Sequence, residues 1–318
     1  LRTRKFLLMA ISTLEWFEEK MGVKYELPHL QFLSYKGIGL GMENYGLIAL
    51  YDLGKVNENN NEFISNSLTL MHEISHMWFG DLVSIKWWDS IWLNEGFAQY
   101  FEYIALLNCL EQLENYAMDM FIKYDGFRCL KFFNFDKIAC KESDFNFSQK
   151  ALRSVHIIGE ENFFKICSIY LNSFKNKSVE ISDFLKVAYD TLKEDYSKFF
   201  DPWLNEIGFP LLNVVEMYNE DYQIIGIAVT QTSLSSKIYQ FNLPILYEKD
   251  GKLEKMNVFI DKEETEIEVN FDWILVNDGF NSLCAVIYSK VLLEKLVNIK
   301  DKISKINAKV ICDSLTHN

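Results

Sequence analysis

The chain has 318 residues, of which 49% are hydrophobic and 24% are charged, and its formal net charge is −13. This length and hydrophobic content allow a sizeable core and favour two domains. The acidic balance argues against a nucleic-acid partner, because phosphate binding requires a basic face, and is more typical of a soluble protein.

Cysteine usage argues against a disulfide-rich protein, and hydropathy argues against a membrane-spanning one. The six cysteines form no C-x-x-C pair and no dense framework, which is typical of reduced core thiols. No run reaches about 18 apolar residues, so we expect no membrane span. The chain begins at Leu1 without a visible signal peptide. We therefore expect part of a longer protein with a cytoplasmic location.

The N-terminal part predicts one helix followed by strands. Apolar residues at a spacing of three to four predict a helix over residues 3–22, closed by Gly22. Residues 30–35 alternate as a strand does, and residues 47–51 predict a second strand.

A glycine-rich segment lies between these two predicted strands. Glycines let a backbone approach a ligand closely, and here they surround Met42-Glu43-Asn44. The four glycines are Gly37, Gly39, Gly41 and Gly46. Taken alone, Glu43 has the pattern of an ordinary exposed carboxylate on a turn. Its functional interpretation depends on the residues downstream.

The central segment carries a metal-binding pattern. Residues 65–79 predict a helix that ends at Gly80-Asp81, and residues 90–108 predict a second helix. In H-E-x-x-H, His72 and His76 are four residues apart, so both imidazoles can face one ion.

Zinc catalysis prefers three protein ligands and one open position, and His, His, Glu is a known set. Glu95 can supply the third ligand from the second helix. Glu73 borders the same face, where its carboxylate can reach a metal-bound water. The alternative is a chance pattern on a surface helix. Hydrophobic and aromatic flanks argue against it, because buried imidazoles without a partner are costly and a metal removes that cost.

In the remainder of the chain, the pattern of apolar residues changes from helical to strand-like and back to helical. Residues 109–200 predict helices with aromatic cores, including helices that start near Gly159 and Ile181. Short alternating runs from Val214 to Val276 predict a small β-sandwich. Residues 289–311 return to a helical pattern.

Three motifs carry a family resemblance: Gly41 to Gly46 (G-M-E-N-Y-G), His72 to Leu82, and Trp88 to Ala98. In order and spacing they resemble the M1 family of zinc aminopeptidases, of the aminopeptidase N type. The resemblance implies an α+β fold with a thermolysin-like, mostly helical zinc-peptidase domain over 1–210. A β-sandwich domain over 211–288 and the start of a helical C-terminal region over 289–318 would follow. It also implies an N-terminal β-domain in the full-length protein.

The resemblance further implies the chemistry of the site. One zinc per chain would be held by His72, His76 and Glu95, with Glu73 as general base on a zinc-bound water. The substrate would be a peptide with a free N-terminus, whose α-amino group Glu43 grips. The residues expected to line the substrate cleft are Gly41, Met42, Glu43 and Asn44.

One departure leaves the activity open. The family's oxyanion tyrosine aligns near Phe145, and Tyr124 is the nearest tyrosine upstream. A zinc-binding but catalytically weak homologue that binds peptides or partners is therefore the alternative to a working zinc aminopeptidase. A thermolysin-type endopeptidase is a lesser rival, and Glu43 argues against it. Asp89 is a candidate to orient a ligating histidine, whereas we interpret Glu102 as a helix-surface charge.

Overall fold

The structure is a computed structural model. The residues that it describes are 2–36, 41–51, 61–109, 158–206, 209–299, 303–304, 307–308 and 311.

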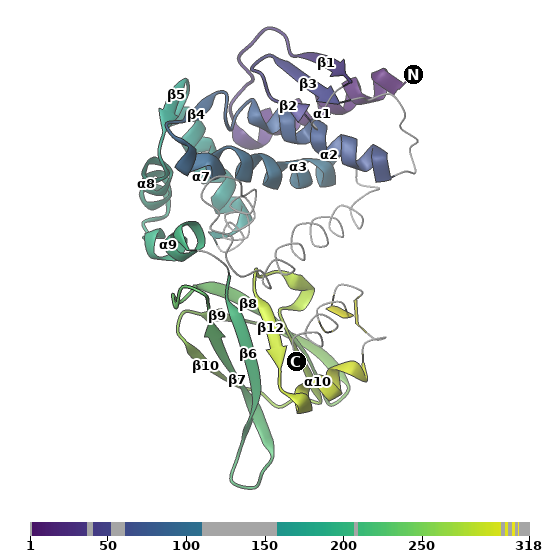
Figure 1. The fold of residues 1–318 in the computed structure, drawn as a ribbon, viewed down its shortest axis with the longest axis vertical. Helices are drawn as coiled ribbons and strands as arrows, with labels where there is room; N and C mark the ends of the chain where they lie inside the picture. The colour runs from purple at the N-terminus through teal and green to yellow at the C-terminus, as the bar shows by residue number, and fades with distance from the viewer. Residues whose placement is uncertain are drawn as a thin grey trace. The chain divides into compact units, whose positions relative to one another are not determined.

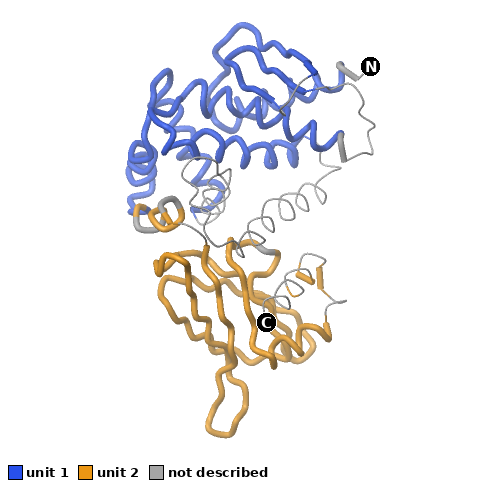
Figure 2. The backbone as a smooth tube through the Cα atoms, in the orientation of Figure 1, with its two compact units in different colours: residues 1–121, 140–196 blue, residues 122–139, 197–318 orange. Residues whose placement is uncertain are grey.

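The described residues fall into two compact units, which are coloured separately in Figure 2. The first unit extends to Tyr196 and contains the helices and short strands of the candidate site. The second begins at Ser197 and is mostly β-structure. The fold is therefore mixed helix and sheet. The domain boundaries expected at residues 210 and 288 stay predictions.

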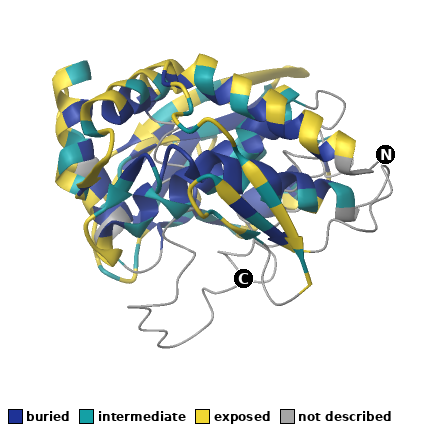
Figure 3. Cartoon of the chain, turned by 90° about the horizontal axis from the view of Figure 1, so that it is seen from above, coloured by how far each residue is buried: buried dark blue, intermediate teal, exposed yellow. Residues whose placement is uncertain are grey.

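Three helices form the core of the first unit: α1 (Arg2–Met21), α2 (Asn61–His76) and α3 (Glu95–Cys109) (Figure 1). The fully buried Phe17 of α1 stacks on Trp78 with ring centroids 5.0 Å apart and meets Phe101 of α3 edge-on. Along the helices, buried and exposed positions lie on opposite sides, as Figure 3 shows. Aromatic packing thus fixes α1 against α3 and against the segment that follows α2.

A small sheet lies against α2. Its strands are β1 (Gln31–Tyr35), β3 (Leu47–Tyr51) and β2 (Gly41–Met42), in that order. β1 and β3 run parallel, and β2 pairs antiparallel with β3. The predicted helix over 3–22 and the strands near 30–35 and 47–51 are confirmed. The contact between β2 and α2 brings the glycine-rich segment to the H-E-x-x-H helix.

The segment between α2 and α3 corrects two predicted boundaries. The helix predicted over 65–79 begins earlier, at Asn61, and ends at His76. The helix predicted over 90–108 is two helices, a 3₁₀ helix η2 (Trp88–Leu93) and α3. They are separated by Asn94, whose φ of −98° and ψ of −80° are not helical. The break makes Glu95 the first residue of α3.

A parallel strand pair ties this segment to a distant part of the first unit. β4 (Val83–Ile85) pairs with β5 (Lys177–Val179), which lies between α7 (Glu160–Phe174) and α8 (Ile181–Leu192). The helices predicted to start near Gly159 and Ile181 are confirmed. None of the described helices is long and apolar enough to cross a membrane.

The described part of the second unit contains two sheets, two α-helices and a 3₁₀ helix. One sheet has the order β10 (Glu264–Glu268), β7 (Ile224–Thr232), β6 (Leu211–Tyr218) and β12 (Ala285–Tyr288), and the other has the order β11 (Trp273–Val276), β8 (Phe241–Lys249) and β9 (Lys252–Ile260). The buried Tyr288 hydroxyl joins them, since it accepts from the Val276 backbone N–H at 2.8 Å and donates to the Val276 carbonyl at 3.2 Å. The helices are α9 (Ser197–Asn205), η6 (Asp278–Phe280) and α10 (Lys290–Val297).

The helix predicted over 289–311 is shorter in the structure. α10 begins after Ser289, whose hydroxyl caps it by accepting from the Leu292 backbone N–H at 3.2 Å. The helix ends at Val297, with Asn298 as its C-cap. The apolar spacing predicted a longer helix because periodicity marks which face is buried, but not where the hydrogen-bond ladder stops.

Candidate metal centre

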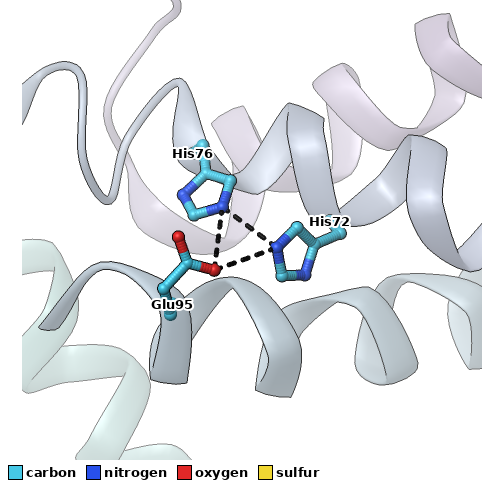
Figure 4. Close-up of side chains that lie close together, drawn as sticks. All are labelled: His72, His76 and Glu95. Carbon is cyan, nitrogen blue, oxygen red and sulfur yellow. Dashed lines mark hydrogen bonds and ion pairs between the residues drawn. The ribbon is translucent and has the colours of Figure 1, made fainter. Parts of the chain in front are cut away.

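Three side chains from two helices converge at one point (Figure 4). His72 and His76 project from α2, and Glu95 projects from the first turn of α3. The two Nε2 atoms are 3.1 Å apart, and Glu95 Oε2 lies 3.4 Å from His72 Nε2 and 3.7 Å from His76 Nε2. These separations are those of ligand atoms around one small cation.

The other nitrogen of each imidazole is held from outside the cluster. His72 Nδ1 lies 2.8 Å from Glu102 Oε2, and His76 Nδ1 lies 3.0 Å from the Phe79 carbonyl oxygen. An acceptor at Nδ1 leaves the Nε2 lone pair free for a metal. Glu102 is therefore not the helix-surface charge that we predicted, and its side chain is only 12% exposed.

Asp89, the other candidate to orient a histidine, lies elsewhere. It is exposed, and its carboxylate accepts a hydrogen bond from the Ser90 hydroxyl at 3.1 Å. Glu95 and Glu102 are seven residues apart, which places both carboxylates on one face of α3. The structure shows that this face meets α2.

Glu73 is buried beside the histidines. It is 5% exposed, and its Oε2 atom has no hydrogen-bond partner among the described residues. Burial raises the pKa of Glu73 to about 8, an effect that His72 opposes and the Glu43 carboxylate reinforces. Glu73 is thus a carboxyl group that can hold a proton near neutral pH.

The glycine-rich segment lies directly against Glu73. A Cβ atom at Gly41 would overlap the Glu73 carboxylate, so only glycine fits here without displacing it. Glu43 follows on the same segment, and its carboxylate lies within 4.8 Å of ligand atoms of Glu73 and His76. Met42 is 47% exposed, and the Asn44 carbonyl accepts from the Leu47 backbone N–H at 2.8 Å.

Asp81 adds another carboxyl group near Glu43. Burial raises the pKa of Asp81 to about 7, and the Glu43 carboxylate contributes to the shift. The Asp81 Oδ2 atom is buried without a partner among the described residues. The region around Glu43 is therefore negative in potential and suited to a cationic group.

A contact that the sequence did not predict joins the two metal-binding segments. Gly80, just after α2, has a φ of +130°, and a Cβ atom there would overlap the side chain of Asn94. Asn94 directly precedes Glu95. Packing of Gly80 against Asn94 thus helps to determine that α3 begins at Glu95, the third proposed ligand.

The donor set fits a zinc ion. Two imidazole nitrogens and one carboxylate oxygen from consecutive helices leave a fourth position open, which is typical of catalytic zinc sites. A second group of ligand atoms, from Glu43, Glu73 and His76, also lies within 4.8 Å. Four residues of the sequence-based hypotheses, Phe145, Tyr124, Gly37 and Gly39, lie outside the described residues.

Comparison with known proteins agrees with the geometry. Residues 7–133 match the peptidase family M1 domain, and this range contains the expected zinc ligands, Glu73 and the segment from Gly41 to Asn44. Glutamyl aminopeptidase of Bos taurus is 28% identical over 267 residues, which is 76% of this chain and 28% of that protein. Probable aminopeptidase 1 of Sulfurisphaera tokodaii is 27% identical over 290 residues, which is 83% of this chain and 35% of that protein.

A further relative covers more of the chain. Tricorn protease-interacting factor F2 of Thermoplasma acidophilum is 27% identical over 322 residues, which is 94% of this chain and 40% of that protein. The chain thus spans only 28% to 40% of the length of these three relatives. The match of residues 7–133 to the peptidase family M1 domain, together with these relatives, supports placing the chain in peptidase family M1.

Proposed function

We propose that the chain is a zinc-dependent aminopeptidase that removes N-terminal residues from peptides. The observation that supports this most strongly is one arrangement around His76. His76 belongs to two groups of side chains, one with His72 and Glu95 and one with Glu73 and Glu43, and the ligand atoms of each group lie within 4.8 Å of one another. A metal, a base and an anion for the peptide's N-terminus are thereby within reach of one scissile bond.

We assign His72, His76 and Glu95 as the ligands of one zinc per chain. Bound there, zinc would polarise the scissile carbonyl and lower the pKa of a water. Glu102 and the Phe79 carbonyl hold the two imidazoles so that both Nε2 atoms face the ion.

Glu73 is proposed as the general base. It takes a proton from the attacking water and delivers it to the leaving amine. Burial raises the pKa of Glu73, which makes its carboxylate a stronger base than that of an exposed glutamate. Its buried, unpartnered oxygen has no competing donor among the described residues.

Glu43 is proposed to bind the α-ammonium group of the substrate. Held there, the α-ammonium group would lie close to the proposed zinc ligand His76, so that the bond after the first residue would be the one cleaved. Gly41, Met42 and Asn44 would line the same side of the cleft, with Gly41 allowing the backbone to approach Glu73.

The finer features of the fold remain part of this proposal. They are a thermolysin-like domain over 1–210, a β-sandwich over 211–288, a helical region from 289 and an N-terminal β-domain in the full-length protein. The match over residues 7–133 supports the first of these features, and the two sheets of the second unit support the β-sandwich. A cytoplasmic location stays a prediction from the sequence.

The test compares free and N-acetylated aminoacyl and peptide substrates with the zinc-loaded chain. We expect cleavage of the free substrates only, because acetylation removes the charge that Glu43 binds. Glu73→Gln should keep its zinc and lose about 10²- to 10⁴-fold in kcat. Equal cleavage of blocked and free peptides would indicate an endopeptidase. Zinc binding without cleavage would favour the weak, peptide-binding homologue.

A further inference from the structure

A cavity of about 370 Å³ lies in the first unit, between residues of α1, α3 and α7. Its apolar lining consists of Trp16, Ile104 and Phe164. The rings of Trp16 and Phe164 meet edge-on with their centroids 6.1 Å apart, so packing holds two of the walls in place. The volume is that of a site for a small molecule.

The cavity is separate from the proposed zinc site. None of His72, His76 and Glu95 lines it. Ile104 comes two positions after Glu102 on α3, and residues with this spacing are directed about 200° apart around a helix. Because Glu95 and Glu102 lie on the face of α3 that meets α2, Ile104 is directed to the opposite side of the helix.

Charged side chains of both signs surround the apolar lining. They are Lys20 of α1, and Glu160 and Glu161 from the first turn of α7. All three are exposed, and within the described part of the chain no ion pair joins Lys20 to either glutamate. The helix ends account for the sign of each charge, but not for the apolar cavity between them. A ligand with an ammonium group, a carboxylate and an apolar body would match all three features.

Trp16 provides a second observation. Its side chain is 9% exposed, and its Nε1–H has no hydrogen-bond acceptor among the described residues. A buried donor without an acceptor is costly. An oxygen atom of a molecule bound in the cavity can supply the acceptor.

We propose that this cavity binds a free amino acid with a large apolar side chain. The ammonium group pairs with Glu160 and Glu161, the carboxylate pairs with Lys20, and the side chain packs on the apolar lining. The binding stands independently of the proposed function. A further consequence rests on that function: an aminopeptidase releases amino acids of this class, so the cavity would be a product-binding site outside the active site.

The primary experiment is isothermal titration calorimetry of the full chain with L-phenylalanine. The amine 2-phenylethylamine lacks the carboxylate, and 3-phenylpropionate lacks the ammonium group. Each should bind about two- to fivefold more weakly than L-phenylalanine, because an exposed ion pair is lost. Glycine should bind at least about tenfold more weakly, because it has no apolar side chain to bury. No binding of L-phenylalanine by the folded chain would overturn the proposal.

Charge variants test the two polar contacts. Lys20→Met should weaken L-phenylalanine binding by about two- to fivefold, as should Glu160→Gln combined with Glu161→Gln. Lys24→Met is the matched control, since Lys24 is exposed in the same unit and does not line the cavity. Equal affinities in Lys20→Met, in the double variant and in Lys24→Met would contradict the proposed contacts.

A variant that fills the cavity tests the location. Ile104→Trp should weaken binding by at least about tenfold, whereas Ile169→Trp should not, because Ile169 is 38% exposed on α7 and does not line the cavity. Cooperative urea unfolding shows that each variant is folded. Binding that is lost in Glu43→Gln but kept in Ile104→Trp would place the amino acid at the proposed active site and overturn the proposal. None of the titrations requires cleavage, so a chain without peptidase activity would disprove the proposed function and leave this test intact.

Discussion

At the scale of single residues, the absence of a side chain at Gly41 is as important to the site as the side chains themselves. Glu73 fills the space where a Cβ atom of residue 41 would be. The base is therefore positioned by a backbone on one side and by its own helix on the other. Misplacing a reacting group by about 1 Å typically costs about 10²-fold in rate.

Gly41→Ala should lower kcat by about 10- to 100-fold with zinc content unchanged, because it displaces Glu73 but touches no metal ligand. Steady-state kinetics and elemental analysis measure the two quantities. Gly251→Ala is the control, since nothing lies within 4 Å of a Cβ atom there. An unchanged kcat in Gly41→Ala would show that this contact does not position the base.

Glu102 is proposed to orient the imidazole of His72 toward the zinc. Glu102→Ala removes the 2.8 Å contact with His72 Nδ1 and should weaken zinc binding by about 10- to 100-fold. Competition with a zinc chelator measures the affinity. Glu102→Gln keeps an acceptor oxygen and should recover part of the loss. If both variants bind zinc as wild type does, Glu102 does not orient His72.

The sequence could predict the metal ligands more fully than their surroundings. His72, His76 and Glu95 follow from helical spacing and from the chemistry of the residue types, and the structure brings them together. Whether Glu102 faces solvent or His72 depends on which face of α3 meets α2, which spacing alone leaves open. The overlap of Gly41 with Glu73 joins residues on different elements, so no local pattern contains it.

At the scale of elements, a tightly packed segment connects the two helices that carry the proposed metal ligands. α2 ends at His76, and α3 begins at Glu95. Between them, Gly80 packs against Asn94 in a conformation that other residues rarely adopt. The sequence predicted one continuous helix through Asn94 because apolar spacing persists there, whereas the observed break depends on this tertiary contact.

Gly80→Ala should destabilise the first unit by about 1–3 kcal/mol from backbone strain alone, with the overlap on Asn94 adding to it. Urea unfolding followed by tryptophan fluorescence measures the change. Gly159→Ala is matched for positive φ, at +85°, but the nearest atom to its Cβ position is 4.0 Å away. A loss of stability no greater than that of Gly159→Ala would show that the Asn94 contact contributes nothing.

At the scale of the whole molecule, the chain has two units that differ in what stabilises them. The first depends on stacked aromatic rings such as Phe17 and Trp78 around the proposed zinc site. The second depends on two sheets and the hydrogen bonds of Tyr288. All of the proposed ligands lie in the first unit.

Tyr288→Phe should therefore destabilise the second unit by about 1–3 kcal/mol, because it leaves the buried Val276 N–H without its acceptor. Zinc stoichiometry should stay at the wild-type value. Thermal unfolding and elemental analysis, carried out on one preparation, measure both. Loss of zinc from a variant that remains folded would mean that the second unit contributes to the metal site.

The pairing of β4 with β5 has a consequence for how the protein is made. The Lys86–Glu180 ion pair beside this pairing spans 94 residues. At a synthesis rate of about 5–20 residues per second, roughly 5–20 s separate the emergence of the two strands from a ribosome. During that interval the nascent chain already carries both histidines and Glu95, but the strand after the H-E-x-x-H helix has no partner. A metal captured cotranslationally would therefore bind before the fold around it has closed.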